Sequence, residues 1–196
     1  MTLWVQKFFK NFSYCGVEMN YIKSENFLCF ATLLEMIFCD IGIEEYTRFD
    51  IAENLGITLP PSAKGLVRNA AYSNYEYEWG IRIDSQKLNT FFHKSGINLH
   101  AEYILTTAYT MLDEEVKKWD HCYVIFLFSY GKLIGNFELQ DVGHAALFID
   151  MQNPQEIRIY DPGPKDCGKK KVSCYRMEEA MYQRRGGYVL IKKLSN

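Results

Sequence analysis

Three apolar runs lie close together in the second half of the chain, and they constrain the fold more than any other feature. They are His121 to Tyr130 (HCYVIFLFSY), Gly143 to Met151 (GHAALFIDM) and Glu156 to Tyr160 (EIRIY). The first is almost continuously apolar, which indicates a buried strand, and the third alternates with the period of two that is typical of strands. Gly131 and the Asn153-Pro154 pair mark turns between the runs. We therefore expect three consecutive strands in a mostly antiparallel sheet.

Helical patterns dominate the first half of the chain. From Cys29 to Ile41, apolar residues recur at helical spacing over a wide face, and Gly42 ends the pattern. Further helices are predicted at 44–55, 85–94, 111–119 and 173–183, and further strands at 98–107 and 188–194, with a long loop at 62–82. Helices that precede a run of strands predict an α+β fold. The 196 residues fit a single domain spanning 1–196, because typical domains have about 100–200 residues.

The composition argues against several classes of function. The chain has 22 Lys and Arg against 24 Asp and Glu, so it lacks the clustered basic excess of a nucleic-acid-binding protein. No N-terminal run has the pattern of a secretion signal, and no stretch reaches the roughly 18 apolar residues of a membrane span. We therefore expect a cytoplasmic protein. Export by a route that needs no N-terminal signal stays an alternative. The six cysteines form no CxxC pair and no zinc-site spacing, so no metal or organic cofactor is predicted.

Cys29 is the first candidate for a catalytic role. It opens the predicted helix that runs to Ile41. The first turn of a helix has unpaired N–H groups and a partial positive charge, which stabilise a thiolate and can also bind an oxyanion. A buried structural cysteine is the alternative interpretation, and the helix start alone does not exclude it.

His144 and Asp161 are the candidates for the base and its orienting acid. His144 follows Gly143 at the start of one predicted strand, and Asp161 ends the next strand in the motif Tyr-Asp-Pro-Gly. In an antiparallel hairpin, the start of the first strand lies beside the end of the second, so these side chains should be neighbours. The carboxylate could then hold one imidazole nitrogen while the other accepts the thiol proton. A histidine with another partner and an aspartate of an ordinary turn are the alternatives.

The order of these motifs resembles that of the papain-like cysteine peptidases. The sequence is most similar to the double-glycine leader peptidases that process bacteriocin precursors, and to their freestanding relatives. The likeness runs from Cys29 to Leu194 and includes CFATLLEMI, CYVIFLF, SCYRMEEAMYQ and GGYVLIKKL. Two positions depart from the family pattern. Lys23 stands where a glutamine usually supplies an oxyanion donor, and Phe30-Ala31 stand where Gly-Pro usually follows the cysteine.

The resemblance implies a papain-like fold, with the nucleophile at a helix start packed on a mostly antiparallel sheet. It implies a cysteine peptidase or related thiol-dependent acyl hydrolase that acts on a peptide or amide through Cys29, His144 and Asp161, without a cofactor. Three alternatives stay open: an acyl- or amide-transferring enzyme of small-molecule biosynthesis, a cell-wall amidase toxin, and an inactive papain-like binding module.

Three further features have two interpretations each. The aromatic residues Tyr72, Tyr75, Tyr77 and Trp79 could line a peptide groove, but residues of this kind more often cover the core beneath a loop. The run Lys169 to Lys171 is predicted to be a solvated loop rather than a nucleic-acid site. Cys167 and Cys174 could form a disulfide in an oxidising compartment, and free thiols are the favoured interpretation.

Overall fold

The computed structural model describes residues 19–105, 122–139, 142–153 and 155–194. Its helices are α2 (Cys29–Asp40), α3 (Arg48–Asn54), α4 (Ser85–Lys94), α6 (Tyr130–Ile134) and α7 (Cys174–Gln183), with short 3-10 turns η2 (Pro61–Ala63), η3 (Glu76–Glu78) and η4 (Phe137–Leu139). Its strands are β1 (Thr58–Leu59), β2 (Ala71–Tyr72), β3 (Leu99–Ile104), β4 (Cys122–Ser129), β5 (Gly143–Asn153), β6 (Glu156–Asp161), β7 (Gly168–Ser173) and β8 (Gly187–Lys193). The predicted α+β class is confirmed.

Six of these strands form one antiparallel sheet in the order β3-β8-β4-β5-β6-β7. The strands β1 and β2 form a separate parallel pair. The expectation of a mostly antiparallel sheet is therefore confirmed, including the three consecutive strands in the second half. The predicted helix at 111–119, and residues 106–107 of the strand expected at 98–107, lie outside the described residues.

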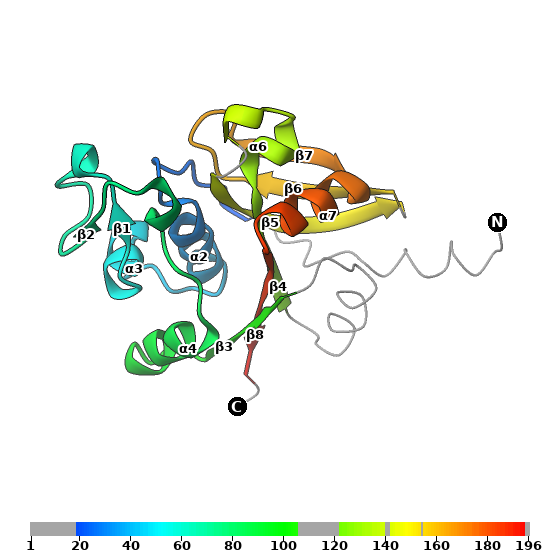
Figure 1. Ribbon diagram of the computed structural model, residues 1–196. Coiled ribbons are helices and arrows are strands. Elements are labelled where there is room, and N and C mark those ends of the chain that lie inside the picture. The colour runs from blue at the N-terminus through cyan, green and yellow to red at the C-terminus, as the bar shows by residue number, and fades with distance from the viewer. Residues whose placement is uncertain (1–18, 106–121, 140–141, 154, 195–196) are drawn as a thin grey trace.

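Helices lie against both faces of the sheet (Figure 1), and buried apolar side chains pack between the helices and each face. On one face, α2, α3 and α4 pack over residues such as Ile125 and Leu147; on the other, α7 and α6 pack over Phe126 and Phe148. Successive residues of a strand point to opposite faces, so a strand between two such layers must be apolar at nearly every position. This explains why the sequence of β4 is almost continuously apolar.

One helix start and one predicted loop differ clearly from the predictions. The second helix begins at Arg48 and not at Glu44, because Thr47 caps it: the Thr47 hydroxyl and the Asp50 carboxylate each accept the other's backbone N–H. The lysine run at 169–171 is not a loop but lies in β7, at the edge of the sheet. Lys169 and Lys171 are exposed while Lys170 is half-buried, and exposed lysines on an edge strand discourage pairing with another chain.

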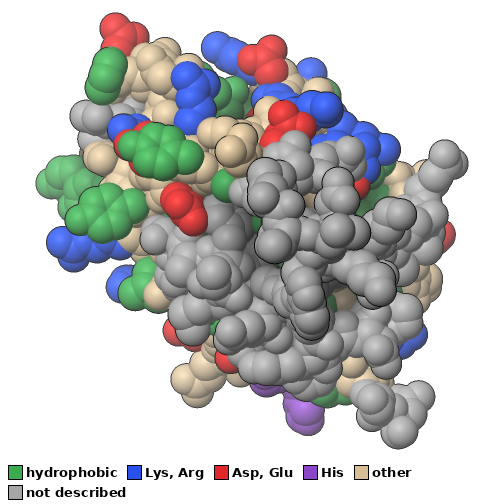
Figure 2. Space-filling view, turned by 90° about the vertical axis from the view of Figure 1, so that its right-hand side faces the viewer, with side chains coloured by type: hydrophobic (Ala, Val, Ile, Leu, Met, Phe, Trp, Pro, Cys, Tyr) green, Lys and Arg blue, Asp and Glu red, His purple; other side chains and the backbone are tan. Residues whose placement is uncertain are grey.

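The surface carries charges of both signs. Lys and Arg side chains stand beside Asp and Glu side chains along the upper rim of the face in Figure 2. Among the residues that the structure describes, no helix has the length and apolar character needed to cross a bilayer.

Candidate active site

Cys29 is the first residue of α2, and the chain reaches it through a tight turn. The Leu28 N–H donates to the Glu25 carbonyl at 3.3 Å, and Phe27 adopts a left-handed φ of 71°. This conformation is uncommon for a residue with a side chain, so the turn needs external support. The Cys29 side chain is half-buried.

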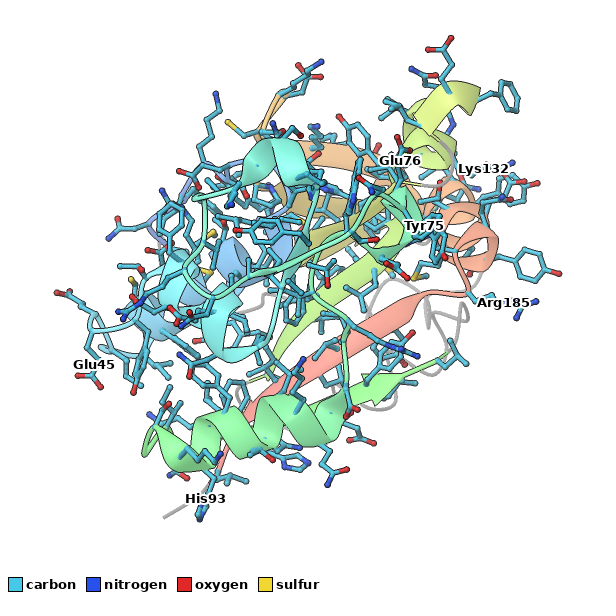
Figure 3. The ribbon with its side chains drawn as sticks, turned by 60° about the vertical axis from the view of Figure 1, so that its left-hand side comes forward. Glu45, Tyr75, Glu76, His93, Lys132 and Arg185 are labelled. Carbon is cyan, nitrogen blue, oxygen red and sulfur yellow. The ribbon has the colours of Figure 1, made fainter. Side chains whose placement is uncertain are left out.

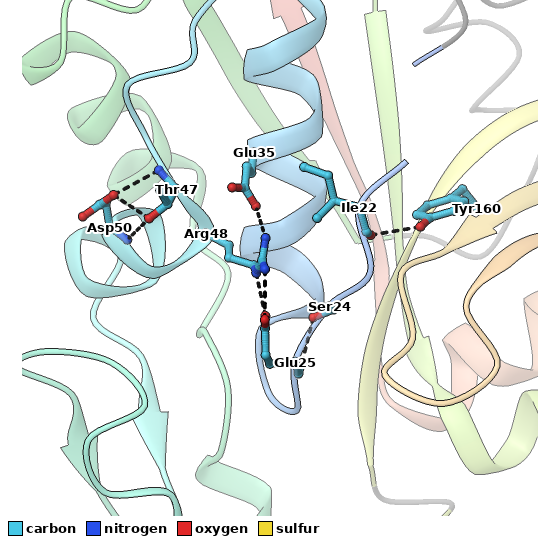
Figure 4. Close-up of polar contacts among 8 residues, drawn as sticks. All are labelled: Ile22, Ser24, Glu25, Glu35, Thr47, Arg48, Asp50 and Tyr160. Carbon is cyan, nitrogen blue, oxygen red and sulfur yellow. Dashed lines mark hydrogen bonds and ion pairs between the residues drawn. The ribbon is translucent and has the colours of Figure 1, made fainter. Parts of the chain in front are cut away.

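Arg48 supplies that support from α3 (Figure 4). Its Nε and Nη2 donate to the two carboxylate oxygens of Glu25 at 2.5 and 2.9 Å, and its Nη1 donates to Glu35 at 2.9 Å. A planar guanidinium that binds one carboxylate with two bonds fixes its orientation as well as its position. The ion pairs therefore connect the turn before Cys29 to both α2 and α3.

The segment before this turn is also bound to the end of β6. The Ser24 N–H donates to the Pro162 carbonyl at 2.7 Å. Figure 4 shows the second bond, in which the Tyr160 hydroxyl donates to the Ile22 carbonyl at 2.9 Å. These two bonds join residues more than a hundred positions apart in the chain. They bring the start of α2 next to the strand that ends at Asp161.

His144 and Asp161 are neighbours, as the hairpin geometry of β5 and β6 predicts. Nε2 of His144 lies 2.7 Å from Oδ1 of Asp161. The side chains are 8% and 2% exposed, so solvent screens this contact little. The carboxylate thereby fixes the imidazole ring and leaves Nδ1 as the ring nitrogen that can meet the Cys29 thiol, with which His144 interacts.

Aromatic rings surround the imidazole. The rings of Phe128 and Tyr130 meet the His144 ring edge to face, with centroids 5.5 and 4.9 Å away. Phe128 lies opposite His144 in the register of β4 and β5. The rings restrict rotation of His144 and exclude water, which strengthens its bond to Asp161.

Asp161 has two further partners. The Gly163 N–H donates to Oδ1 at 2.9 Å, and the Lys170 ammonium donates to Oδ2 at 2.6 Å. Sequence reasoning missed Lys170, because a run of three lysines gave no apolar alternation from which a strand could be recognised. The pairing of β6 with β7 is what carries Lys170 to the carboxylate.

The surroundings of Cys29 favour its thiolate. Burial acts to raise the pKa of the thiol, but the hydrogen bond and positive charge of His144, with the N–H groups of Ala145 and Phe30, bring the pKa below its ordinary value. A thiol of lowered pKa at the start of a helix is a potential nucleophile.

The same contacts favour a charged imidazole. Burial acts to lower the pKa of His144, yet the bonds to Asp161 and Cys29 raise it to about 9. Burial also acts to raise the pKa of Asp161, while His144, Lys170 and the Gly163 N–H bring it below its ordinary value. These shifts favour the thiolate of Cys29, the imidazolium of His144 and the carboxylate of Asp161.

The other described histidines, and Lys23, are exposed, unlike His144. His93 and His100 are exposed, and Figure 3 shows His93 at the outer end of α4, pointing away from the body of the protein; His121 lies outside the described residues. Lys23, at the position of the expected glutamine, is exposed.

The aromatic residues of 72–79 do not all cover the core, so that favoured interpretation is wrong for the tyrosines. Tyr75 and Tyr77 are 61% and 66% exposed and stack on each other, with ring centroids 5.6 Å apart. Trp79 is half-buried and meets Phe27 edge to face at 5.7 Å. This loop therefore abuts the turn that precedes Cys29.

The remaining cysteine prediction concerns Cys167 and Cys174. Both are free thiols, and burial raises the pKa of Cys174 to about 11, so it is not a competing nucleophile. Within the described part of the chain, no three His, Cys, Asp or Glu side chains gather in a way that could hold a metal ion.

Comparison with protein-family models finds no match to this sequence. A search of curated proteins finds no significant match either.

Proposed function

We propose that the protein is a cysteine peptidase or related thiol-dependent acyl hydrolase of papain-like fold, with a peptide or amide as its substrate. The observation that carries the proposal is the buried contact of 2.7 Å between His144 and Asp161, beside Cys29 at the start of α2, whose thiol interacts with His144. A nucleophile, a base and an orienting acid in this order are the parts that acyl transfer needs.

The first half of the reaction would form a thioester. The Cys29 thiolate attacks the substrate carbonyl carbon, and the carbonyl oxygen becomes an oxyanion near the start of α2. The backbone N–H of Cys29 is our candidate donor to that oxygen. The His144 imidazolium then protonates the leaving amine as the carbon–nitrogen bond breaks, which leaves the acyl group on the Cys29 sulfur and His144 neutral.

The second half would release the acid. Neutral His144 takes a proton from water, and the resulting hydroxide attacks the thioester carbonyl. The carbon–sulfur bond breaks, the carboxylic acid leaves, and the thiolate and imidazolium form again. Asp161 keeps Nδ1 directed at Cys29 throughout and stabilises the charged ring.

One observation favours a second candidate, an inactive papain-like binding module. The residue at the position of the expected oxyanion donor, Lys23, is exposed, and removal of a side-chain donor of this kind costs an enzyme roughly 100-fold to 1000-fold in kcat. A chain that lacks that donor can keep the fold and a substrate-binding surface without turnover.

A peptide-library digest separates the two candidates. The wild-type protein and its Cys29→Ala variant are each incubated with a mixture of peptides from a digested proteome, and new N-termini are identified by mass spectrometry. Cys167→Ala is the matched control, because Cys167 is an exposed free thiol. We expect the same cleavages from wild type and Cys167→Ala and none from Cys29→Ala. Identical cleavages from all three proteins would contradict the proposal, and no cleavage together with an unreactive Cys29 would favour the binding module.

A further inference from the structure

We propose that Lys170 is a positioning residue of the site, which holds Asp161 and sets the pH range over which Cys29 and His144 are charged. The inference rests on the proposed function. It adds a fourth charged group, from an edge strand, to the three residues that the sequence indicates.

The register of β6 and β7 explains how Lys170 reaches the carboxylate. Asp161 pairs with Gly168, and Lys170 pairs with Ile159, so Asp161 and Lys170 are diagonal neighbours on one face of the sheet. Gly168 has no side chain to come between them. The ammonium lies 2.6 Å from Oδ2, on the oxygen that His144 does not use. Lys170 is 29% exposed, whereas the Asp161 side chain is 2% exposed.

The charge balance of the cluster gives Lys170 a function. A thiolate at Cys29, an imidazolium at His144 and a carboxylate at Asp161 sum to one negative charge in a buried site. An unbalanced charge is costly in such surroundings and promotes proton uptake. Lys170 brings the sum to zero. It therefore stabilises the state in which Cys29 is already ionised.

Loss of the Lys170 ammonium should move the titrations of Cys29 and His144 in the same direction. A cation next to Asp161 offsets part of the negative charge that stabilises the imidazolium. It also favours the deprotonated form of each titratable group nearby. Removal of the ammonium should therefore raise the proton affinity of both Cys29 and His144, and both of their titrations should move to higher pH. A residue that merely filled space would leave the midpoints unchanged.

Other titratable groups near Asp161 and Lys170 come from each neighbouring element. Lys171 and Arg176 line the same pocket, and Tyr130 from α6 interacts with both groups. Tyr160, Asp166, Cys167 and Tyr21 are also close by. Of these, Lys171 is the matched control for charge: it is the next residue of β7, it is 66% exposed, and it pairs with Glu156 at 3.4 Å.

The pocket also permits a rescue experiment. It has a volume of about 430 Å³, and it is lined by residues that include Asp161, Lys170, Leu133 and Arg176. A small alkylammonium ion can enter a space of this size. In a Lys170→Ala variant, ethylammonium could then occupy the place of the missing ammonium group.

The test measures two titrations in the full-length protein. The rate at which iodoacetamide alkylates Cys29 is followed against pH by peptide mapping, and the His144 ring is titrated by NMR. We expect Lys170→Met to move both midpoints up by about half a pH unit or more. Lys170→Arg and Lys171→Met should keep the wild-type midpoints. Ethylammonium chloride should restore them in Lys170→Ala, and sodium chloride at equal ionic strength should not.

The outcomes separate this inference from the proposed function. Wild-type midpoints in a folded Lys170→Met variant would overturn the role of Lys170 and leave the nucleophile intact. An equal shift in Lys171→Met would also overturn it, because the effect would then be general surface charge. A wild-type Cys29 that titrates as an ordinary thiol would overturn both proposals.

Discussion

Nε2 of His144 lies 2.7 Å from Oδ1 of Asp161, and this contact leaves Nδ1 as the ring nitrogen that can meet Cys29. Both side chains are almost completely buried. The bond therefore acts on the protonation of His144 as well as on its orientation.

An Asp161→Asn substitution tests that bond. The amide keeps the size of the side chain but removes the negative charge, so we expect the pKa of His144 to fall from about 9 toward or below its ordinary value, since burial then acts unopposed by the carboxylate. NMR titration of the His144 ring measures the change. Asp166→Asn is the matched control, because Asp166 is an exposed acid nearby. A His144 pKa that stays near 9 in Asp161→Asn would show that the carboxylate is not its cause.

The pH range of activity is a second prediction. Cys29 must be ionised, and its pKa is lowered, so activity should rise at a pH below the ordinary thiol value of about 8.5. His144 must be protonated to deliver a proton to the leaving group, so activity should fall as pH passes about 9. The rate of peptide cleavage against pH gives both limbs. A rate that only begins to rise near the ordinary thiol pKa would contradict the ion pair.

Arg48 gives a prediction about the support of the nucleophile. In Arg48→Met, Glu25 and Glu35 lose their shared partner, and we expect a loss of about 1 kcal/mol in the free energy of unfolding, because these groups are partly exposed. Alkylation of Cys29 should also slow, since the turn at Phe27 is less well held. Urea unfolding and peptide mapping measure the two effects. Arg82→Met changes an exposed arginine and should alter neither quantity.

Gly186 gives a prediction about the sheet. A Cβ at this position would overlap the carbonyl oxygen of Leu127, and backbone cannot move aside as a flexible side chain can. We expect Gly186→Ala to destabilise the protein by about 2 kcal/mol. At Gly143, the atoms nearest to a Cβ belong to the flexible end of the Arg184 side chain, the closest at 3.0 Å, so Gly143→Ala should cost clearly less. Equal losses of unfolding free energy in the two variants would contradict this account of packing.

The part of the site that could be predicted from the sequence is the part that depends on local structure. A cysteine at the start of an amphipathic helix, and a histidine and an aspartate at the two ends of a hairpin, are each recognisable within about a dozen residues. Antiparallel pairing then requires His144 and Asp161 to be neighbours. The three apolar runs predicted strands β4, β5 and β6 from local sequence in the same way.

The parts that could not be predicted depend on contacts between distant segments. Arg48 is exposed or buried according to how α3 packs on α2, and nothing in its own surroundings in the sequence indicates a bond to Glu25. Lys170 belongs to a strand only because β6 offers an edge to pair with. The exposure of Tyr75 and Tyr77 likewise depends on the path of a long loop, for which side-chain periodicity gives no rule.

The most direct test of the central claim is the relative reactivity of Cys29 at about pH 6, measured by competitive alkylation of all six cysteines with iodoacetamide and peptide mapping. We predict that Cys29 reacts at least about tenfold faster than any other cysteine, and that His144→Ala removes this advantage. A Cys29 that reacts no faster than the exposed thiol of Cys167 would contradict the thiolate–imidazolium pair on which the account depends.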